Sequence, residues 1–225
     1  MSQRRKLLQS QEKLLDLARR DPSALYTKEY YDSGLTVSGY TVYGRFEPWL
    51  SFFGKIAEKV VKKYRPKTAV DIGCAFGLLT EALVDRGVDA VGFDISEFAI
   101  TQAREDMRDR LKVHPITEPI PLCDGKRYDL AICIEVLEHL PPEHTELAVK
   151  NLCACADRII FSSTPDDFDE PTHFNVRTTE EWLNLFAQQG FLPPRKSAAT
   201  YISANARVVE RAAERRPFWL SLLSR

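Results

Sequence analysis

The run T-A-V-D-I-G-C-A-F-G at residues 68–77 limits what this chain can fold into more than any other stretch of the sequence. It begins with apolar residues, carries Gly73 and Gly77, and leads into the helical pattern L-L-T-E-A-L-V-D-R-G. A strand that turns through glycine into a helix suits nucleotide-like ligands, because the helix N-terminus offers free backbone N–H groups and glycine allows close approach. We therefore expect a ligand site at the end of this strand.

The spacing of the glycines narrows the kind of ligand. A dinucleotide-binding turn has the pattern G-x-G-x-x-G, but Ala75 and Leu78 stand where its second and third glycines would be. A phosphate-binding P-loop would continue with Gly-Lys-Ser or Gly-Lys-Thr, and this chain does not. Asp71 precedes the first glycine, and its charge would repel a phosphate but suits a cationic or hydroxyl-bearing ligand.

Strand-like and helix-like segments alternate after residue 66. We expect strands over 68–72, 89–93, 111–116, 128–134 and 157–162, and helices over 77–86, 96–109, 143–154 and 178–189. Short, continuously apolar strands are typical of a mainly parallel sheet covered by helices on both faces. Residues 194–211 predict an antiparallel pair of strands, and residues 48–65 predict a further helix with Pro48 in its first turn.

Composition argues against several classes of protein. A net charge of −1 over 225 residues lacks the basic character expected of a nucleic-acid-binding protein. No apolar run reaches the ~20 residues of a membrane span, and the charged N-terminus lacks the apolar segment of a signal peptide. The five cysteines lack paired C-x-x-C spacing, so we expect free thiols and a cytoplasmic protein.

The first 47 residues form an expected N-terminal unit. Residues 2–20 have a basic amphipathic pattern, and we expect this helix to pack on the rest of the chain; the alternative is binding to a membrane or a partner. Residues 26–47 carry aromatic side chains among glycines, which indicates either a lid over a site or packing at the domain edge. We favour a site role for Tyr40 and Tyr43.

The last residues, 212–225, form a tail with several apolar side chains after a proline. We expect this tail to fold back onto its own domain. The alternatives are contact with a membrane surface, which we do not favour, and contact with a second copy of the chain, which would give a homodimer.

Three motifs in order resemble those of one enzyme family. V-D-I-G-C-A-F-G at 70–77, V-G-F-D-I-S at 91–96 and Y-D-L-A-I-C-I-E-V-L-E-H-L at 128–140 are similar to the successive motifs of class I S-adenosylmethionine-dependent methyltransferases. The resemblance implies a Rossmann-like α/β fold for residues 48–211, with a seven-stranded, mostly parallel sheet, helices on both faces and an antiparallel last strand. It also implies S-adenosylmethionine as the cofactor.

The resemblance assigns roles to residues at the strand ends. Asp94 would accept hydrogen bonds from the ribose diol, and Asp71 would face the amino group of the cofactor. The family often has an aspartate after the third strand that contacts adenine; Ile116 and Thr117 stand there instead, and Thr117 or a backbone carbonyl would substitute. The other expected cofactor-binding residues are Gly73, Cys74, Ala75, Phe76, Gly77, Ile95, Cys133, Glu135, Tyr40 and Tyr43.

Two histidines are the candidates for chemistry. A hydroxyl acceptor must lose its proton during methyl transfer, and histidine is suited to take it near neutral pH. His139 follows the fourth strand in E-V-L-E-H-L, and His173 lies in P-T-H-F-N-V-R after the fifth. The alternatives are a structural hydrogen bond for His139 and a loop-stapling one for His173; His114 and His144 look peripheral. The acids near residue 170 are expected to be solvated, and we expect no metal.

The sequence therefore predicts an S-adenosylmethionine-dependent methyltransferase that acts on a hydroxyl of a small-molecule or glycan acceptor. One alternative is a protein or other macromolecular acceptor. A nucleic-acid base is disfavoured because I-E-V-L stands where an N-P-P-Y-like segment would follow the fourth strand. The other alternative is a non-catalytic partner protein that keeps the methyltransferase fold.

Overall fold

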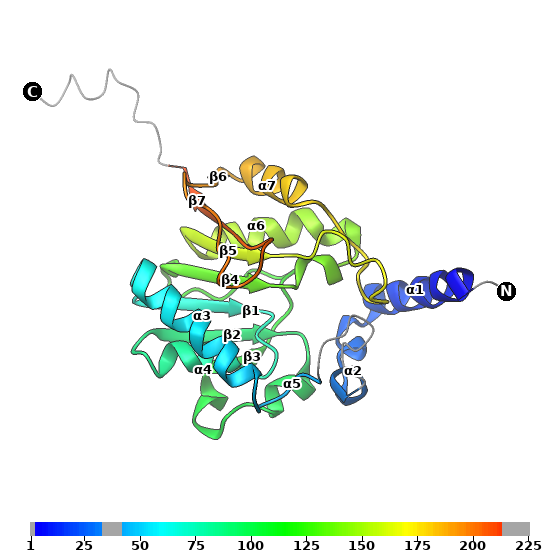
Figure 1. Ribbon diagram of the computed structural model, residues 1–225, viewed down its shortest axis with the longest axis horizontal. Coiled ribbons are helices and arrows are strands. Elements are labelled where there is room, and N and C mark those ends of the chain that lie inside the picture. Colours follow the sequence, from blue (N-terminus) through cyan, green and yellow to red (C-terminus); the bar gives the residue numbers. More distant parts are fainter. Residues whose placement is uncertain (1–2, 33–41, 213–225) are drawn as a thin grey trace, which may run out of the picture.

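The computed structural model describes residues 3–32 and 42–212, built around one seven-stranded sheet (Figure 1). The strands are β1 (Thr68–Ile72), β2 (Asp89–Asp94), β3 (Leu111–Val113), β4 (Leu130–Ile134), β5 (Arg158–Ser162), β6 (Phe191–Leu192) and β7 (Arg207–Arg211). Their order is β3-β2-β1-β4-β5-β7-β6. The first five pair in parallel, and β7 is antiparallel to both β5 and β6. This arrangement confirms the predicted fold class.

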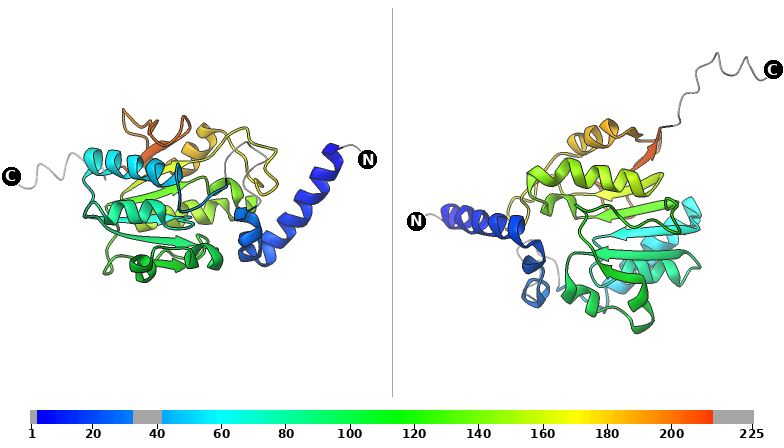
Figure 2. Two further views of the ribbon diagram at one scale, coloured as in Figure 1. Left: turned by 60° about the horizontal axis from the view of Figure 1, so that its bottom comes forward. Right: turned by 180° about the vertical axis from the view of Figure 1, so that it is seen from behind.

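Helices cover both faces of the sheet (Figures 1 and 2). The α-helices are α1 (Gln3–Arg20), α2 (Lys28–Asp32), α3 (Trp49–Tyr64), α4 (Leu78–Val84), α5 (Glu97–Thr101), α6 (Thr145–Cys155) and α7 (Thr179–Gln188). Short 3₁₀ turns include η1 (Pro22–Leu25), η3 (Glu105–Arg110), η4 (Leu137–His139) and η5 (Pro142–His144). Buried side chains of α3 and α4 join one core cluster, and those of α6 and α7 join another.

Alternation along the central strands explains why they are apolar throughout. Val70 of β1 belongs to the core on the α6 and α7 side, whereas its neighbour Ala69 belongs to the core on the α3 and α4 side. On β4, Ala131 and Ile132 divide in the same way, and all four side chains are buried. Successive side chains of a strand point to opposite faces, so a sheet covered on both sides needs apolar residues at every position.

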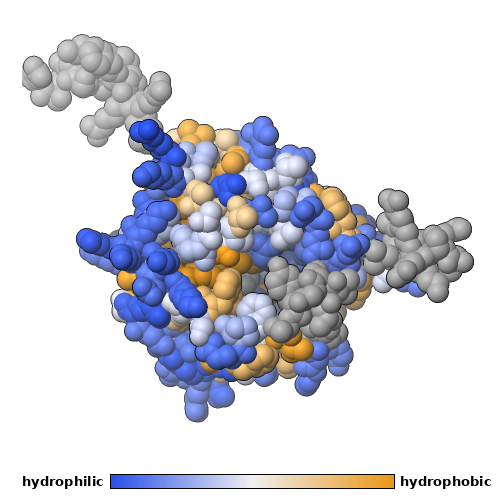
Figure 3. All heavy atoms as spheres, viewed as in Figure 1, coloured by the Kyte–Doolittle hydropathy of each residue, from blue (hydrophilic) through white to orange (hydrophobic). Residues whose placement is uncertain are grey.

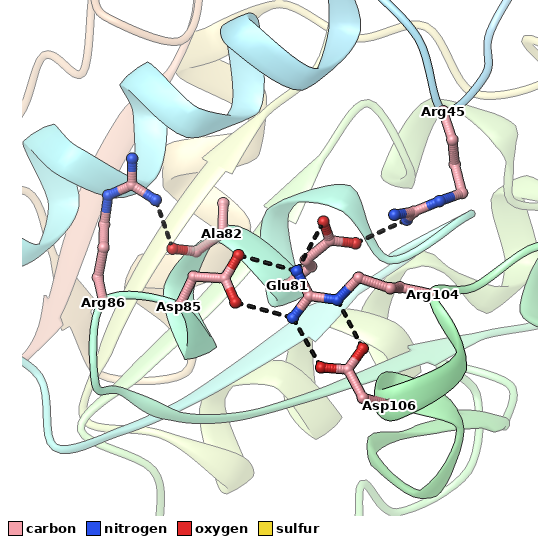
Figure 4. A network of polar contacts seen from close by, with 7 residues as sticks. All are labelled: Arg45, Glu81, Ala82, Asp85, Arg86, Arg104 and Asp106. Carbon is pink, nitrogen blue, oxygen red and sulfur yellow. Dashed lines mark hydrogen bonds and ion pairs between the residues drawn. The ribbon is translucent and has the colours of Figure 1, made fainter.

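The helix predicted over 96–109 is wrong in its extent. Helix α5 ends at Thr101, and the chain turns at Arg104, whose backbone angles (φ −56°, ψ 139°) are extended, before it continues as η3. The Arg104 guanidinium reaches Glu81 on α4, Asp85 at the C-cap of that helix, and Asp106 (Figure 4). These ion pairs stabilise the turn at Arg104 in place of a continued helix. They join segments about 20 residues apart, so the local hydrophobic periodicity could not predict them.

Two predicted strands also differ from the structure. The strand expected over 111–116 ends at Val113, before Pro115, which has no N–H for a strand ladder. Of the pair expected within 194–211, β7 forms, but its outer partner is β6 rather than the segment before it. That segment contributes a single bridge between Ala198 and Arg207.

The predicted N-terminal helix is present as α1, beyond the carboxyl ends of the parallel strands (Figure 1). Ala18 is buried, Gln11 donates a hydrogen bond to the His173 carbonyl at 3.1 Å, and Arg19 pairs with Glu143 at 2.6 Å. No helix among the described residues is long and apolar enough to cross a membrane. Tyr40 and most of the C-terminal tail, residues 213–225, lie outside the described residues.

The surface is mainly polar on the side of the molecule seen in Figure 3, with apolar side chains gathered near the middle of that face. Four partly exposed apolar side chains lie close together in sequence at and before the start of α3: Val42, Phe46, Leu50 and Phe52. Phe52 also lines the cavity described next.

Candidate active site

A cavity of about 590 Å³ opens where the carboxyl ends of β1, β2, β4 and β5 meet. This is the place at which open parallel sheets bind ligands, because the loops after neighbouring strands diverge there. The volume is within the range of pockets that hold a small ligand or cofactor. Eleven residues predicted for the site line it: Asp71, Gly73, Cys74, Ala75, Asp94, Ile95, Thr117, Glu135, Tyr43, His139 and His173.

Three predicted site residues do not line the cavity. Cys133 is fully buried in the sheet core, and Phe76 packs behind the aromatic wall described below. Gly77 has φ +73°, and an added Cβ would lie 2.3 Å from Leu111 Cδ1, so this glycine is required by packing against β3. His114 and His144, expected to be peripheral, do line the cavity.

The turn after β1 is fixed by backbone geometry. Gly73 has φ +73°, and a Cβ there would lie 2.2 Å from Val136 Cγ2. The N–H groups of Gly73 and Cys74 both donate to the Phe93 carbonyl, at 2.8 and 3.1 Å. Ala75 also has a positive φ, +46°, a conformation that is costly for a residue with a side chain. The loop is therefore held in one shape against β2.

Asp71 lies at the buried base of this loop. Its carboxylate accepts a hydrogen bond from Thr80 Oγ1 at 2.9 Å, and only 4% of the residue is exposed. Burial raises the pKa of Asp71 to about 7, against the smaller opposing effect of the Thr80 hydrogen bond. This carboxyl can therefore change its charge near neutral pH.

Asp94 connects three parts of the site. One carboxylate oxygen accepts from the Ala75 N–H and the other from the Ser96 N–H, both at 2.8 Å. Burial raises the pKa of Asp94, while those backbone hydrogen bonds favour the ionised form. Each carboxylate oxygen can accept a further hydrogen bond. Ser96, not Asp94, caps α5, because its hydroxyl accepts from the Ala99 N–H at 3.0 Å, a geometry that completes the N-cap of the helix.

An aromatic wall from the N-terminal segment closes one side of the cavity. Tyr31 and Tyr43 line it, and their rings lie 4.9 and 5.1 Å from the ring of Phe76 behind them. Trp49 packs beside Tyr43 and also faces the cavity. Burial raises the pKa of both tyrosines well above the ordinary value, so their hydroxyls stay neutral.

The histidines meet at the other end of the cavity, with ring centroids 4.6 Å apart. Asn175 attaches the His173 loop to η4. Its N–H donates to the Glu138 carbonyl, and its side-chain amide donates to the Leu137 carbonyl. Burial, together with the charge of His173, lowers the pKa of His139 to about 3. His139 is therefore neutral at ordinary pH.

Both imidazoles are anchored through Nδ1. His139 Nδ1 lies 2.9 Å from Thr172 Oγ1, which itself donates to Glu170 Oε1 at 2.8 Å. His173 Nδ1 lies 2.8 Å from the Asp167 carbonyl oxygen. Glu170 is buried, although the sequence placed it in a solvated run of acids. Thr172 and Asn175 were not singled out by sequence; the signal available was their place in the loop that carries His173.

Two carboxyl side chains from the turn after β4, those of Glu135 and Glu138, meet at the N–H of Thr164. Glu135 has φ +51°, an uncommon conformation for a side-chain residue, and its Oε2 accepts from the N–H and the hydroxyl of Thr164. Glu138 is fully buried, and this burial, together with neighbouring Glu135, raises its pKa well above the ordinary value. The charged form of Glu138 is therefore disfavoured. Within the described ranges, no group of three His, Cys, Asp or Glu side chains is placed to hold a metal ion.

Residues 70–157 match the family described as a methyltransferase domain. Curated relatives include a ubiquinone biosynthesis O-methyltransferase of Methylococcus capsulatus, 34% identical over 102 residues, which cover 44% of this chain and 43% of the relative. Another of the same name, from Azoarcus sp., is 31% identical over 53% of each chain. The chain thus spans about half the length of the curated relatives it matches.

Solved structures share the fold at lower sequence identity. A magnesium protoporphyrin IX methyltransferase from Synechocystis superposes with a TM-score of 0.60 at 18% identity, covering 85% of this chain and 98% of that one. An amino pentose methyltransferase from Micromonospora echinaspora gives 0.61 at 13%, covering 81% and 96%. The sheet order and the glycine turn define a class I methyltransferase fold. Residues 70–157 thus match the methyltransferase-domain family, and the chain as a whole shares the fold of these methyltransferase structures.

Proposed function

We propose that this protein transfers a methyl group from S-adenosylmethionine to a hydroxyl of a small-molecule acceptor. One observation carries the proposal: a single cavity joins the Asp71 loop and Asp94 at one end to His139 and His173 at the other. The first end offers carboxylates for the amino group and the ribose hydroxyls of S-adenosylmethionine. The second end offers imidazoles that can take the proton of a hydroxyl.

The residues at the first end fit the cofactor chemically. Asp94 keeps acceptor capacity for two ribose hydroxyls after its two backbone hydrogen bonds. Asp71 offers a carboxyl to a cationic amino group, which would favour its ionised form. His114 Nε2 is buried without a partner among the described residues, and its residue lines the cavity together with Ile116 and Thr117. This nitrogen is a candidate for the adenine contact that the sequence left open.

The residues of the chain have two tasks in the reaction. Bound S-adenosylmethionine supplies a methyl group on a sulfonium, which is already a good leaving group. The protein must therefore orient the acceptor oxygen in line with that methyl carbon and remove its proton. His139 lies within the cavity and is unprotonated at ordinary pH, and with a pKa of about 3 it needs a group that stabilises its imidazolium when it takes the proton.

A phenolic or similar hydroxyl fits the acceptor end better than a charged group. Carboxyl side chains of Glu135, Asp167 and Glu170 line this part of the cavity, and they disfavour an anionic acceptor. The relatives named ubiquinone biosynthesis O-methyltransferase support oxygen as the acceptor atom. A glycan stays the alternative, supported by the structural similarity to an amino pentose methyltransferase.

The test is transfer of labelled methyl groups. The protein would be incubated with methyl-labelled S-adenosylmethionine and separate sets of phenols, catechols and free sugars, followed by chromatography. We expect label in a phenol or catechol ether. Label only on protein would support the macromolecular alternative, and cofactor binding without transfer to any acceptor would support a non-catalytic role.

A cytoplasmic location and a homodimer stay predictions.

Asp94→Ala tests the cofactor end separately. Loss of charge-assisted hydrogen bonds, each worth about 1.5–3 kcal/mol, should weaken cofactor binding at least about tenfold in calorimetry. Asp89→Ala is the matched control, because Asp89 begins the same strand and is exposed at its opposite end. Equal affinities in the two variants would remove Asp94 from the ribose site.

A further inference from the structure

The geometry points to a hydrogen-bonded relay from Glu170 through Thr172 that holds the single N–H proton of neutral His139 on Nδ1. The Nε2 lone pair is then left for the acceptor, and His139 acts as the base. Thr172 and Glu170 are positioning residues in this scheme. The catalytic part of the inference rests on the proposed methyl transfer to a hydroxyl. The arrangement of protons can be measured without it.

The direction of each hydrogen bond follows from the donors available. The backbone N–H of Thr172 lies 3.3 Å from Glu170 Oε1, and the Thr172 hydroxyl lies 2.8 Å from the same oxygen. An ionised carboxylate only accepts, so the hydroxyl must give it its single proton. The Thr172 oxygen can then only accept from His139 Nδ1, 2.9 Å away.

The resulting tautomer determines what the ring can do. His139 is neutral, so a proton on Nδ1 leaves Nε2 with a lone pair. Within the described part of the chain, no hydrogen bond is made by Nε2, and His139 lines the cavity. Nε2 is therefore the nitrogen that can take a proton from a bound acceptor.

His173 differs in what stands behind its ring. Its Nδ1 is bonded to the backbone carbonyl of Asp167, and the Asp167 carboxylate oxygen is 3.9 Å away, beyond hydrogen-bond distance. When His139 becomes an imidazolium, one hydroxyl connects its Nδ1 to a buried carboxylate. A carboxylate stabilises that cation better than a carbonyl does, as in serine hydrolase triads.

The surroundings of Thr172 restrict it further. The Tyr30 hydroxyl also hydrogen-bonds the Thr172 side chain, and burial keeps Tyr30 neutral. Thr172 itself is buried, with 5% of its surface exposed. A hydroxyl with its contacts on Glu170, His139 and Tyr30 has little freedom to rotate, so the His139 ring keeps one orientation.

The acceptor oxygen gives its proton to His139 Nε2 and forms the new bond to the methyl carbon, while the electron pair of the broken carbon–sulfur bond stays on sulfur. The positive charge that leaves the sulfonium reappears on the imidazolium. Glu170 then faces that charge through Thr172, and the proton passes to solvent after product release.

Nitrogen NMR tests the tautomer directly. Two-bond proton–nitrogen spectra of protein labelled in the histidine rings would be recorded, with His139 assigned by its loss in His139→Gln. We expect His139 as the Nδ1–H tautomer. Thr172→Val should convert it to the Nε2–H form, and Thr172→Ser, which keeps the hydroxyl, should not. An Nε2–H form in the wild-type protein would overturn the relay, even if Thr172→Val failed to fold.

Turnover with the phenol or catechol that the labelling experiment identifies tests the positioning role of Thr172. Thr172→Val should lower kcat about 10- to 100-fold, in the range of general-base effects, and leave calorimetric cofactor affinity within about twofold. Thr172→Ser should restore kcat. Glu170→Gln keeps an acceptor oxygen but loses the charge, so it should keep the tautomer and still lower kcat. Unchanged kcat in Thr172→Val would overturn the relay, whereas absence of transfer by the wild-type protein would overturn the proposed function instead.

Discussion

At the scale of single residues, the site combines groups whose charge is controlled by burial. Asp71 and Glu138 are carboxyls with raised pKa values, and His139 is an imidazole with a lowered one. In each case the largest cause is removal from water, which disfavours the charged form. The site and its buried surroundings are therefore less charged at neutral pH than their residue types indicate.

Asp71 makes the stability of the ligand-free protein depend on pH. Its pKa is about 7 in the folded state and about 4 when unfolded, so between these values the folded state holds the extra proton. The free energy of unfolding should fall as pH rises through this window, by up to about 4 kcal/mol. Urea unfolding of wild type and Asp71→Asn from pH 4 to 8 measures the difference, and parallel curves would contradict it.

Bound cofactor should reverse that preference. A cationic amino group beside Asp71 favours the carboxylate, so binding below pH 7 should release a proton and affinity should rise toward pH 7. Calorimetry in buffers of different ionisation enthalpy measures the protons released. Release that is the same in Asp71→Asn would show that another group is responsible.

Gly73 is constrained by both its conformation and its neighbour. A Cβ there would lie 2.2 Å from Val136 Cγ2, whereas Gly87 has a similar positive φ, +80°, with nothing within 4 Å. Gly87→Ala should cost about 1 kcal/mol for the backbone alone, and Gly73→Ala should cost 1–3 kcal/mol more. Equal losses of unfolding free energy in urea would mean that Val136 moves away freely.

At the scale of elements, long-range ion pairs connect segments that sequence periodicity treats separately. Arg104 joins the turn after α5 to Glu81 of α4 and to Asp85 at the C-cap of that helix, and Arg45 reaches the same Glu81 (Figure 4). Glu81 is buried, and both arginines compensate its charge. The network fixes where α5 ends.

Arg104→Ala should therefore destabilise more than loss of a simple surface pair. We expect about 1 kcal/mol, reduced in 1 M salt, because the guanidinium is still about one-third exposed. Arg110→Ala, which removes a single exposed pair with Asp89, should cost less than about 0.5 kcal/mol. Thermal unfolding at low and high salt compares them, and a smaller effect of Arg104→Ala would exclude a role for the network.

The sequence was informative wherever the signal was local. Apolar runs located β1, β2, β4 and β5, and because carboxyl ends of parallel strands meet at one edge, Asp71, Asp94 and His139 could be placed around one crevice. The end of α5 and the partner of β7 depend on contacts between distant segments. The bond from Thr172 to His139 joins two loops 33 residues apart, and no periodicity encodes it.

At the scale of the whole molecule, the N-terminal segment completes a site that the sheet begins. Tyr26, Tyr31 and Tyr43 line the cavity opposite the strand ends, and α1 is tied to the His173 loop through Gln11. The boundary at residue 47 stays a prediction, but the cavity draws side chains from both sides of it.

Trp49 allows binding to be followed in the intact protein. It lines the cavity beside Tyr43, whereas Trp182 is fully buried under the sheet. Binding of S-adenosylmethionine should change the tryptophan emission, and Trp49→Phe should remove most of that change. Asp94→Ala, expected to bind poorly, is the control at equal cofactor concentration. A full signal in Trp49→Phe would place the ligand away from this wall.

The carboxylate of Asp94 accepts two hydrogen bonds, from the N–H groups of Ala75 and Ser96. They assemble one end of the cavity before any ligand arrives, so little ordering entropy remains to be lost on binding. At the other end, α1 is attached to the His173 loop by Gln11 and to η5 by an exposed Arg19–Glu143 pair. Substitutions in α1 can therefore alter that end while the Asp94 end keeps its shape.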